Sequence, residues 1–293
     1  MIQTVNAKIN IGLHIIGRRA DGYHELSTLF YPVGLMSGTP ESPWPFSDIL
    51  EITPLTEGDS HRFTFTGNLI DCPLEKNLVW RAVDAFEKHY KERTGFHLPA
   101  MSVHLEKHIP DGAGLGGGSA DASFTLRMLN QLTGELFFPE ELLDISSTLG
   151  ADCPFFIYNK PCLAEGIGEK LTCVDLDLSS YWLVILKPSF GISTRVAFSG
   201  VAIGEYRSAA LPLHSPPEGW RESVYNDFEL HLFERYPVLR QLKDALYESG
   251  ACYAQMSGSG SAVYGIFSSL GKAQAAWRRG CRDRDIYTAL MRL

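Results

Sequence analysis

Residues 110–120 of this chain read PDGAGLGGGSA, a composition that suits the binding of an anion. Five glycines fall within seven consecutive positions, and because glycine lacks a Cβ, such a run can bring several backbone N–H groups close to one phosphate. Residues 101–109 alternate between apolar and polar types as a strand does. From 120 to 132 apolar residues recur at helical spacing, which predicts a helix whose free N–H groups and positive dipole end add to the site. This succession of strand, glycine loop and helix predicts a phosphate-binding site.

Two commoner kinds of glycine loop fit this segment poorly. A P-loop requires a lysine after its last glycine, and Gly118 stands at that position. A dinucleotide-binding fingerprint requires a second strand that ends in an acidic residue about 20 positions later, whereas residues 139–149 are predicted to be helical. A flexible glycine turn without a ligand is the remaining alternative.

A lysine and an asparagine lie close together near the N-terminus, in the segment AKINIGL at 7–13. Strand alternation places the apolar residues at 9, 11 and 13 on one face and Lys8, Asn10 and Gly12 on the other. The side-chain-free glycine leaves room beside the two polar groups. This polar patch is a candidate part of the site; a solvated strand face is the alternative.

A single carboxylate, Asp152, stands in the apolar segment LGADCPFF at 149–156. Gly150 is typical of a residue that follows a helix, and Pro154 prevents that helix from continuing. Burial of a carboxylate is costly unless a cation pairs with it, and Lys8 is a candidate partner. An aspartate that caps a helix is the alternative.

Two further segments have turn composition. In RRADGYHEL at 18–26, Asp21-Gly22 predicts a tight turn that presents Tyr23 and His24 directly after the bend. By itself this is also an ordinary hairpin end. The run SGSGS at 257–261 joins two predicted strands, either as a plain hairpin turn or as a second group of backbone donors to a phosphate.

Composition limits the class of protein. The formal net charge of −8 argues against nucleic acid or an anionic membrane as the main partner, so any anion site must be locally positive. The six cysteines show neither a C-x-x-C pair nor a zinc-ligand spacing, which favours reduced thiols and a cytoplasmic location. The N-terminal ten residues do not resemble a signal peptide, and no apolar run approaches the roughly 20 residues of a membrane span.

The elements that position these residues are of mixed type, so the predicted fold class is α+β. We expect two domains, at 1–156 and 157–293, and a surface loop at 36–47, which contains three prolines. Strands are predicted at 3–16, 26–33, 48–53, 62–66, 101–109, 163–164, 182–187, 251–256 and 262–267, and helices at 76–94, 119–132, 139–149, 229–249 and 270–282.

The chain resembles the GHMP small-molecule kinases. The resemblance rests on four motifs in order: A-K-I-N, P-x-G-x-G-L-G-G-G-S-A, G-A-D-x-P-F-F and S-G-S-G-S. The R-x-A-D-G-Y-H-E-L and L-G-A-D-x-P-F-F segments are most similar to members that phosphorylate a cytidine diphosphate alcohol for isoprenoid precursor synthesis. The resemblance extends from about residue 5 to residue 267. It implies an N-terminal domain like ribosomal protein S5 domain 2, a ferredoxin-like C-terminal domain and an active site between them.

The resemblance also implies roles for individual residues. Asp152 would be the catalytic base, and Lys8 would orient it and neutralise charge. ATP would be the phosphate donor, and Mg²⁺ is expected to bridge its oxygens, with no protein ligand assigned. The substrate-binding residues would be Asn10, Tyr23, His24 and Phe198. The residues expected to bind ATP are Asn77, Pro110, Asp111, Gly112, Ala113, Gly114, Leu115, Gly116, Gly117, Gly118, Ser119, Ala120, Gly258 and Ser259.

The chain departs from this pattern in two places, and its motifs leave other functions open. The loop at 36–47 is longer than is usual in such kinases, and Ala120-Asp121 replaces a Ser-Asn pair found in some members, so no ligand role is assigned to Asp121. The main alternative is a GHMP kinase that acts on a sugar or a mevalonate-type alcohol. A non-catalytic nucleotide-binding protein of the same fold is disfavoured because both Lys8 and Asp152 are present.

Overall fold

The computed structural model describes residues 1–34, 46–56, 60–70, 72–201 and 215–293. Most of the surface loop predicted at 36–47 therefore lies outside the described residues. The chain forms two compact units. The first unit comprises 1–7, 47–110 and 116–159, and the second comprises 8–46, 111–115 and 160–293.

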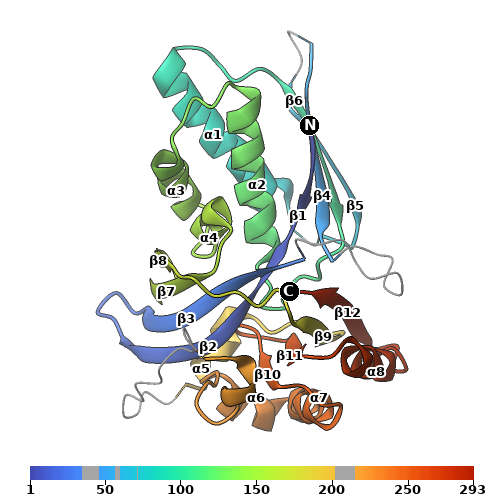
Figure 1. Ribbon diagram of the computed structural model, residues 1–293. Coiled ribbons are helices and arrows are strands. Elements are labelled where there is room, and N and C mark those ends of the chain that lie inside the picture. Colours follow the sequence, from blue (N-terminus) through green and yellow to red (C-terminus); the bar gives the residue numbers. More distant parts are fainter. Residues whose placement is uncertain (35–45, 57–59, 71, 202–214) are drawn as a thin grey trace. The chain divides into compact units, whose positions relative to one another are not determined.

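The first unit is a four-stranded sheet covered by helices. Helices α1 (Leu78–Thr94) and α2 (Gly117–Leu132) lie side by side over one face of the sheet (Figure 1). The strand order is β1-β4-β6-β5, and only β5 and β6 run parallel, joined by a crossover through α1. The remaining elements are β1 (Ile2–Val5), β4 (Asp48–Pro54), β5 (Arg62–Gly67), β6 (Met101–Lys107), the short 3₁₀ turn η1 (Leu74–Lys76), α3 (Pro139–Ser147) and α4 (Cys153–Tyr158).

The glycine loop begins after β6, where the alternation of buried and half-buried residues in that strand ends. Val103 and Leu105 are buried on one face of β6, and the intervening side chains are half-buried. Pro110 cannot donate to a strand partner, and glycines with positive φ follow it. Small residues in the first turns of α2 then allow that helix to be buried from Ala120 to Asn130 at most positions. The loop thus connects, along the chain, two elements that are buried in the first unit.

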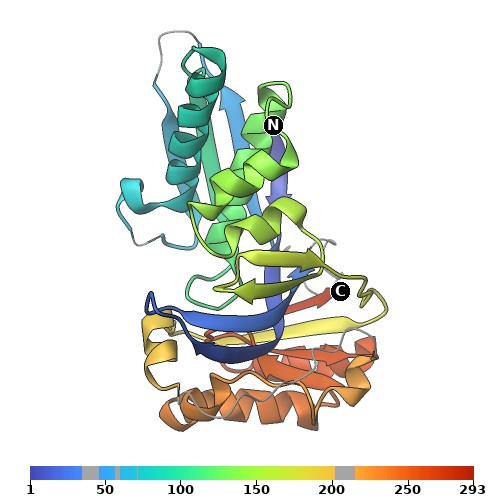
Figure 2. The same cartoon turned by 90° about the vertical axis from the view of Figure 1, so that its left-hand side faces the viewer.

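The second unit contains two four-stranded sheets. One has the order β2-β3-β7-β8, and Figure 2 shows β7 and β8 beside the long hairpin of β2 and β3. The other has the order β10-β11-β9-β12, and α7 and α8 pack against it (Figure 1). The elements are β2 (Ala7–Arg18), β3 (His24–Val33), β7 (Cys162–Gly166), β8 (Lys170–Cys173), β9 (Trp182–Pro188), α5 (Thr194–Ser199), η2 (Pro217–Gly219), α6 (Glu229–Arg235), α7 (Pro237–Glu248), β10 (Tyr253–Met256), β11 (Val263–Phe267), α8 (Leu270–Gly280) and β12 (Ile286–Arg292).

The mixed α+β content is as predicted, but several elements differ. The single helix predicted at 229–249 is wrong: it is broken into α6 and α7, because Tyr236 precedes Pro237 and adopts a non-helical φ of −129° and ψ of 76°. The strand predicted at 3–16 is two strands, which meet at Asn6. The prediction missed α4, α5, β8 and β12.

The compact units are not contiguous in sequence, unlike the predicted domains 1–156 and 157–293. Residues 8–46 and 111–115 belong to the same unit as the C-terminal part of the chain. No described helix is long and apolar enough to cross a membrane. All six cysteines lie in the described ranges, and all are free thiols.

Candidate active site

The first half of the glycine loop is fixed within the second unit by the turn at 257–262. The carbonyl oxygen of Gly112 accepts from the Ser261 N–H at 3.2 Å, and that of Ala113 accepts from the Ala262 N–H at 3.1 Å. The carbonyl oxygen of Gly114 accepts from the Ser257 hydroxyl at 2.8 Å. Three consecutive carbonyls of the loop therefore point toward this turn.

These carbonyl contacts determine where the loop's N–H groups point. In a trans peptide unit the C=O and the following N–H point in opposite directions. The N–H groups of Ala113, Gly114 and Leu115 consequently point away from the 257–262 turn. Converging N–H groups in a glycine-rich loop form a concave anion site. Gly258 and Ser259 thus belong to the structure that orients the loop.

The second half of the loop forms the N-terminus of α2 in the first unit. Gly116 is the N-cap, with a φ of +71°, and no side chain caps the helix. The first N–H groups of a helix have no partner within the helix, so those of Gly117, Gly118 and Ser119 are available to an anion. The 16-residue length of α2 provides a full dipole behind them.

Gly114→Ala is expected to disrupt this arrangement. Gly114 has a φ of +74°, and a Cβ there would lie 2.0 Å from the Ser257 carbonyl oxygen, which is backbone. We expect a loss of about 2–4 kcal/mol in the free energy of unfolding, from left-handed strain and steric overlap together. Chemical denaturation measures this loss. Gly134→Ala is the matched control: its φ is +83°, nothing lies within 4 Å, and only the strain of about 1–2 kcal/mol applies. If both variants lost the same free energy of unfolding, steric overlap with the Ser257 carbonyl oxygen would not contribute to the effect of Gly114→Ala.

Lys8 and Asn10 lie together on β2, as predicted from their spacing. The Lys8 Nζ donates to the Asn10 Oδ1 at 2.5 Å and lies 4.6 Å from the centre of the Phe30 ring. Asn10 Nδ2 donates to the Thr28 hydroxyl at 3.0 Å, and the Asn10 N–H donates to Ser257 Oγ at 3.2 Å. β2 is buried on both faces from Ala7 to His14, which rules out a solvated polar face. Asn10 is therefore held between Lys8 and the turn that holds the glycine loop.

Asp152 directly precedes α4 in the first unit. Its carboxylate makes no capping hydrogen bond to that helix, so the capping alternative is wrong. Asp152 is half-buried, less than expected for a carboxylate in an apolar segment. Its neighbour Cys153 is buried, and burial raises the pKa of that thiol to about 11; a hydrogen bond with Ser119 partly opposes this rise, and the charge of Asp152 adds to it. Ser119 of the glycine loop and Asp152 thus both influence the pKa of this thiol.

The predicted base-reading residues lie on β3, α5 and the turn before β3. The His24 and Phe198 rings stack with centroids 4.6 Å apart and an interplanar angle of 17°. Tyr23, the residue before His24, is 61% exposed. Burial, and secondarily the charge of Arg18, lowers the pKa of His24, which favours the neutral imidazole. A neutral imidazole can both donate and accept a hydrogen bond.

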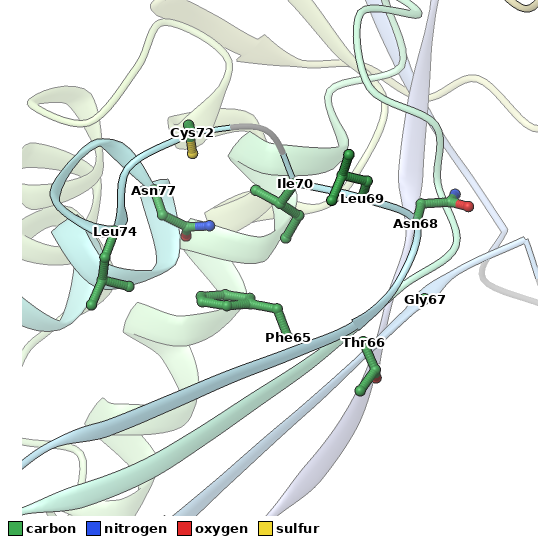
Figure 3. Close-up of a pocket in the computed structure, with 9 residues that line it drawn as sticks. All are labelled: Phe65, Thr66, Gly67, Asn68, Leu69, Ile70, Cys72, Leu74 and Asn77. Carbon is green, nitrogen blue, oxygen red and sulfur yellow. The ribbon is translucent and has the colours of Figure 1, made fainter.

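A cavity of about 320 Å³ opens in the first unit beside Asn77, one of the residues that the family resemblance assigns to ATP binding (Figure 3). Asn77 is also the N-cap of α1, with its Oδ1 accepting from the Val79 N–H at 2.9 Å. The figure shows Phe65 and Ile70 projecting toward the same space as Asn77. The lining residues are Phe65, Thr66, Gly67, Asn68, Leu69, Ile70, Cys72, Leu74 and Asn77.

Two buried polar residues of the second unit, Asn226 and Lys187, were not found from the sequence. Asn226 Nδ2 donates to the carbonyls of Met256 and Gly258 at 2.9 and 2.8 Å, which fixes the 257–262 turn. The buried Lys187 donates to the carbonyls of Pro188 and Phe190. Burial lowers the pKa of Lys187, and the charge of Asp111 at the start of the loop opposes that shift. Of the two, only Lys187 could have been found from the sequence, because it is a charged residue at the end of an apolar strand.

Known proteins similar to this chain are GHMP kinases. The model of the GHMP kinases N terminal domain matches residues 77–160, and that of the GHMP kinases C terminal domain matches 213–283. The chain is 45% identical over 268 residues to the 4-diphosphocytidyl-2-C-methyl-D-erythritol kinase of Parabacteroides distasonis, covering 91% of this chain and 92% of that one. It is 44% identical over 272 residues to the enzyme of the same name from Bacteroides fragilis, covering 92% of each.

The solved structures similar to this chain include a kinase of the same kind as these relatives. A crystal structure of 4-(cytidine 5'-diphospho)-2C-methyl-D-erythritol kinase matches over 100% of both chains, with a TM-score of 0.78 and 29% identity. A mevalonate kinase structure matches 100% of this chain and 98% of its own, with a TM-score of 0.69 and 13% identity, which indicates a shared fold alone. The predicted two-domain fold is thereby confirmed. The chain belongs to the GHMP kinase family and, within it, to the group of the 4-diphosphocytidyl-2-C-methyl-D-erythritol kinases.

Proposed function

We propose that this ATP-dependent kinase phosphorylates the 2-hydroxyl of 4-diphosphocytidyl-2-C-methyl-D-erythritol, giving the 2-phosphate and ADP, in isoprenoid precursor synthesis by the non-mevalonate route. The observation that carries the proposal is the glycine loop, whose carbonyls are fixed by the 257–262 turn, in a chain 45% identical to a kinase of that name. The N–H groups of the loop would bind the ATP phosphates.

The transfer itself needs positioning and charge stabilisation more than covalent catalysis. Asp152 would accept the proton of the 2-hydroxyl while that oxygen bonds to the γ-phosphorus. The bond to the bridging oxygen between the β and γ phosphorus atoms breaks, and ADP leaves. Lys8 would stabilise the negative charge, and Asn10, held by Lys8, would position the hydroxyl.

Each nucleobase has a candidate position. Adenine would enter the cavity beside Asn77, which has apolar walls and an amide at its edge. Cytosine would stack between Tyr23 and Phe198. Because His24 covers a face of Phe198, the His24 ring would move aside, leaving its nitrogens free for the edge of the base.

Mg²⁺ would accompany ATP, bound by phosphate oxygens and water. The described residues contain no group of three or more histidine, cysteine, aspartate or glutamate side chains that could hold a metal ion. No protein ligand to the ion is proposed.

Tyr23→Ala is expected to raise the KM for the cytidine substrate about 5- to 30-fold, because stacking of a base on an aromatic ring contributes about 1–2 kcal/mol. The affinity for ATP should not change. Steady-state kinetics with each substrate varied in turn measure both effects. Tyr23→Phe keeps the ring and is the control, with a KM near that of the wild type. An unchanged KM in Tyr23→Ala would contradict the stacking role.

Substrate choice tests the proposed function directly. ADP release from ATP is measured with the cytidine diphosphate alcohol, with the free alcohol, with a sugar and with mevalonate. We expect turnover with the first alone. Turnover with mevalonate or the sugar instead would establish the alternative GHMP kinase activity, and equal turnover with all four would exclude recognition of the cytidine group.

A further inference from the structure

A buried ion cluster lies beneath the start of α2 in the first unit. The Lys107 ammonium, at the end of β6, contacts the Asp48 carboxylate and donates to the Asp121 Oδ2 at 2.8 Å. None of the three side chains is more than 3% exposed. Breaking a buried ion pair leaves an uncompensated charge, so the three positions are strongly constrained.

The cluster joins the two segments on either side of the glycine loop. The Asp48 Oδ1 accepts from the N–H groups of His108 and Ile109 at 2.6 and 2.8 Å, just before the loop begins. Asp121, on the other side, lies in the second turn of α2. Lys107 therefore connects the last residues of the strand to the first turns of the helix.

The ammonium also lies directly against the phosphate-binding backbone. A Cβ on Gly117, the first residue of α2, would be 2.9 Å from the Lys107 Nζ. The absence of a side chain at Gly117 lets the helix start approach the ammonium this closely. A displacement of Lys107 would thus be transmitted to the first N–H groups of α2.

The two carboxylates of the cluster differ in their hydrogen bonds. Both oxygens of Asp48 have donors, whereas the Asp121 Oδ1 is buried with no partner in the described part of the chain. Burial raises the pKa of Asp121 well above its usual range, and Lys107 opposes this only in part. Burial acts against the Lys107 ammonium, but Asp121 and Asp48 outweigh it and raise the pKa of Lys107.

We propose that Lys107, held by Asp48 and Asp121, is a positioning residue for ATP. It does not touch the nucleotide. It fixes the N–H groups at the start of α2 at the distance that the phosphates require. This role rests on the proposed function, in which that loop binds ATP.

Lys107→Met tests the proposal, because methionine keeps the length and the apolar stem but removes the charge. The KM for ATP should rise about 10-fold or more, since small misplacements of binding groups have effects of this size. The KM for the cytidine substrate should stay the same. Amide hydrogen exchange in the peptide that covers 108–121 should become faster without nucleotide. Arg93→Met is the matched control: it removes another cation–carboxylate contact of the first unit, with Glu141, and should leave the KM for ATP unchanged.

Two outcomes would overturn the proposal: an unchanged KM for ATP in folded Lys107→Met, or an equal rise in both KM values. If Lys107→Met does not fold, Lys107→Met/Asp121→Asn, which leaves one buried carboxylate without an ammonium in place of two, is measured in the same way. Binding of a non-hydrolysable ATP analogue and hydrogen exchange need no turnover. Failure of the wild type to phosphorylate the cytidine alcohol would therefore count against the proposed function, and normal ATP-analogue binding by the variant would count against the positioning role.

Discussion

Asp152→Asn is expected to lower turnover about 10²- to 10⁴-fold, the usual contribution of a positioned general base, while ATP still binds with wild-type affinity. Asparagine has nearly the same shape as aspartate but cannot accept the hydroxyl proton. Asp152 makes no capping hydrogen bond to α4, so the substitution removes no helix cap. Single-turnover phosphoryl transfer, together with binding of an ATP analogue, measures the two effects separately.

The matched control for this variant is Asp144→Asn. Asp144 is an exposed carboxylate on α3 of the same unit, so the control makes the same chemical change away from the phosphate loop. Its turnover should equal that of the wild type. A rate for Asp152→Asn within about threefold of the wild type would show that another group accepts the proton.

The parts of the site that depend on local sequence could be predicted. Glycine spacing at 110–120, the Asp21-Gly22 turn and the alternation of Lys8 and Asn10 each reflect backbone preferences that act within a few residues. The structure has the expected loop, turn and strand at these places. The single helix wrongly predicted at 229–249 could also have been divided on local grounds. The residue before a proline disfavours helical backbone, and Pro237 follows Tyr236, where α6 ends.

The parts that depend on distant contacts could not be predicted. The carbonyls of the glycine loop find their donors at 257–262, about 150 residues away in sequence, and Asn226 fixes that turn from a third segment. No local preference encodes such pairings. Lys107 is intermediate: strand alternation places it on the apolar face of β6 with Val103 and Leu105, and a lysine at such a position indicates a buried partner without naming it.

Lys8→Met is expected to reduce kcat about 10²- to 10³-fold, the size found when one preorganised electrostatic group is removed from an active site. Lys8 is buried, with 3% of the residue exposed, so solvent provides little compensation for the lost charge. Methionine keeps the length of the side chain and its packing against Phe30, which limits the change to the lost ammonium. The loss should appear in kcat more than in the KM for either substrate. A purely structural lysine would instead lower the melting temperature and leave kcat unchanged.

The proposed mechanism assigns Lys8 and Asp152 to the same proton transfer, and a double-variant cycle tests that assignment. When two groups act in the same proton transfer, the rate losses caused by removing each of them do not multiply. Once one group is lost, removing the other lowers the rate little further. The double variant Lys8→Met/Asp152→Asn should therefore be about as slow as the slower single variant. If the two losses multiplied instead, the lysine and the aspartate would act in separate steps. Thermal unfolding of all four proteins controls for stability. Non-additivity in kcat without non-additivity in stability would place both side chains at the same hydroxyl during transfer.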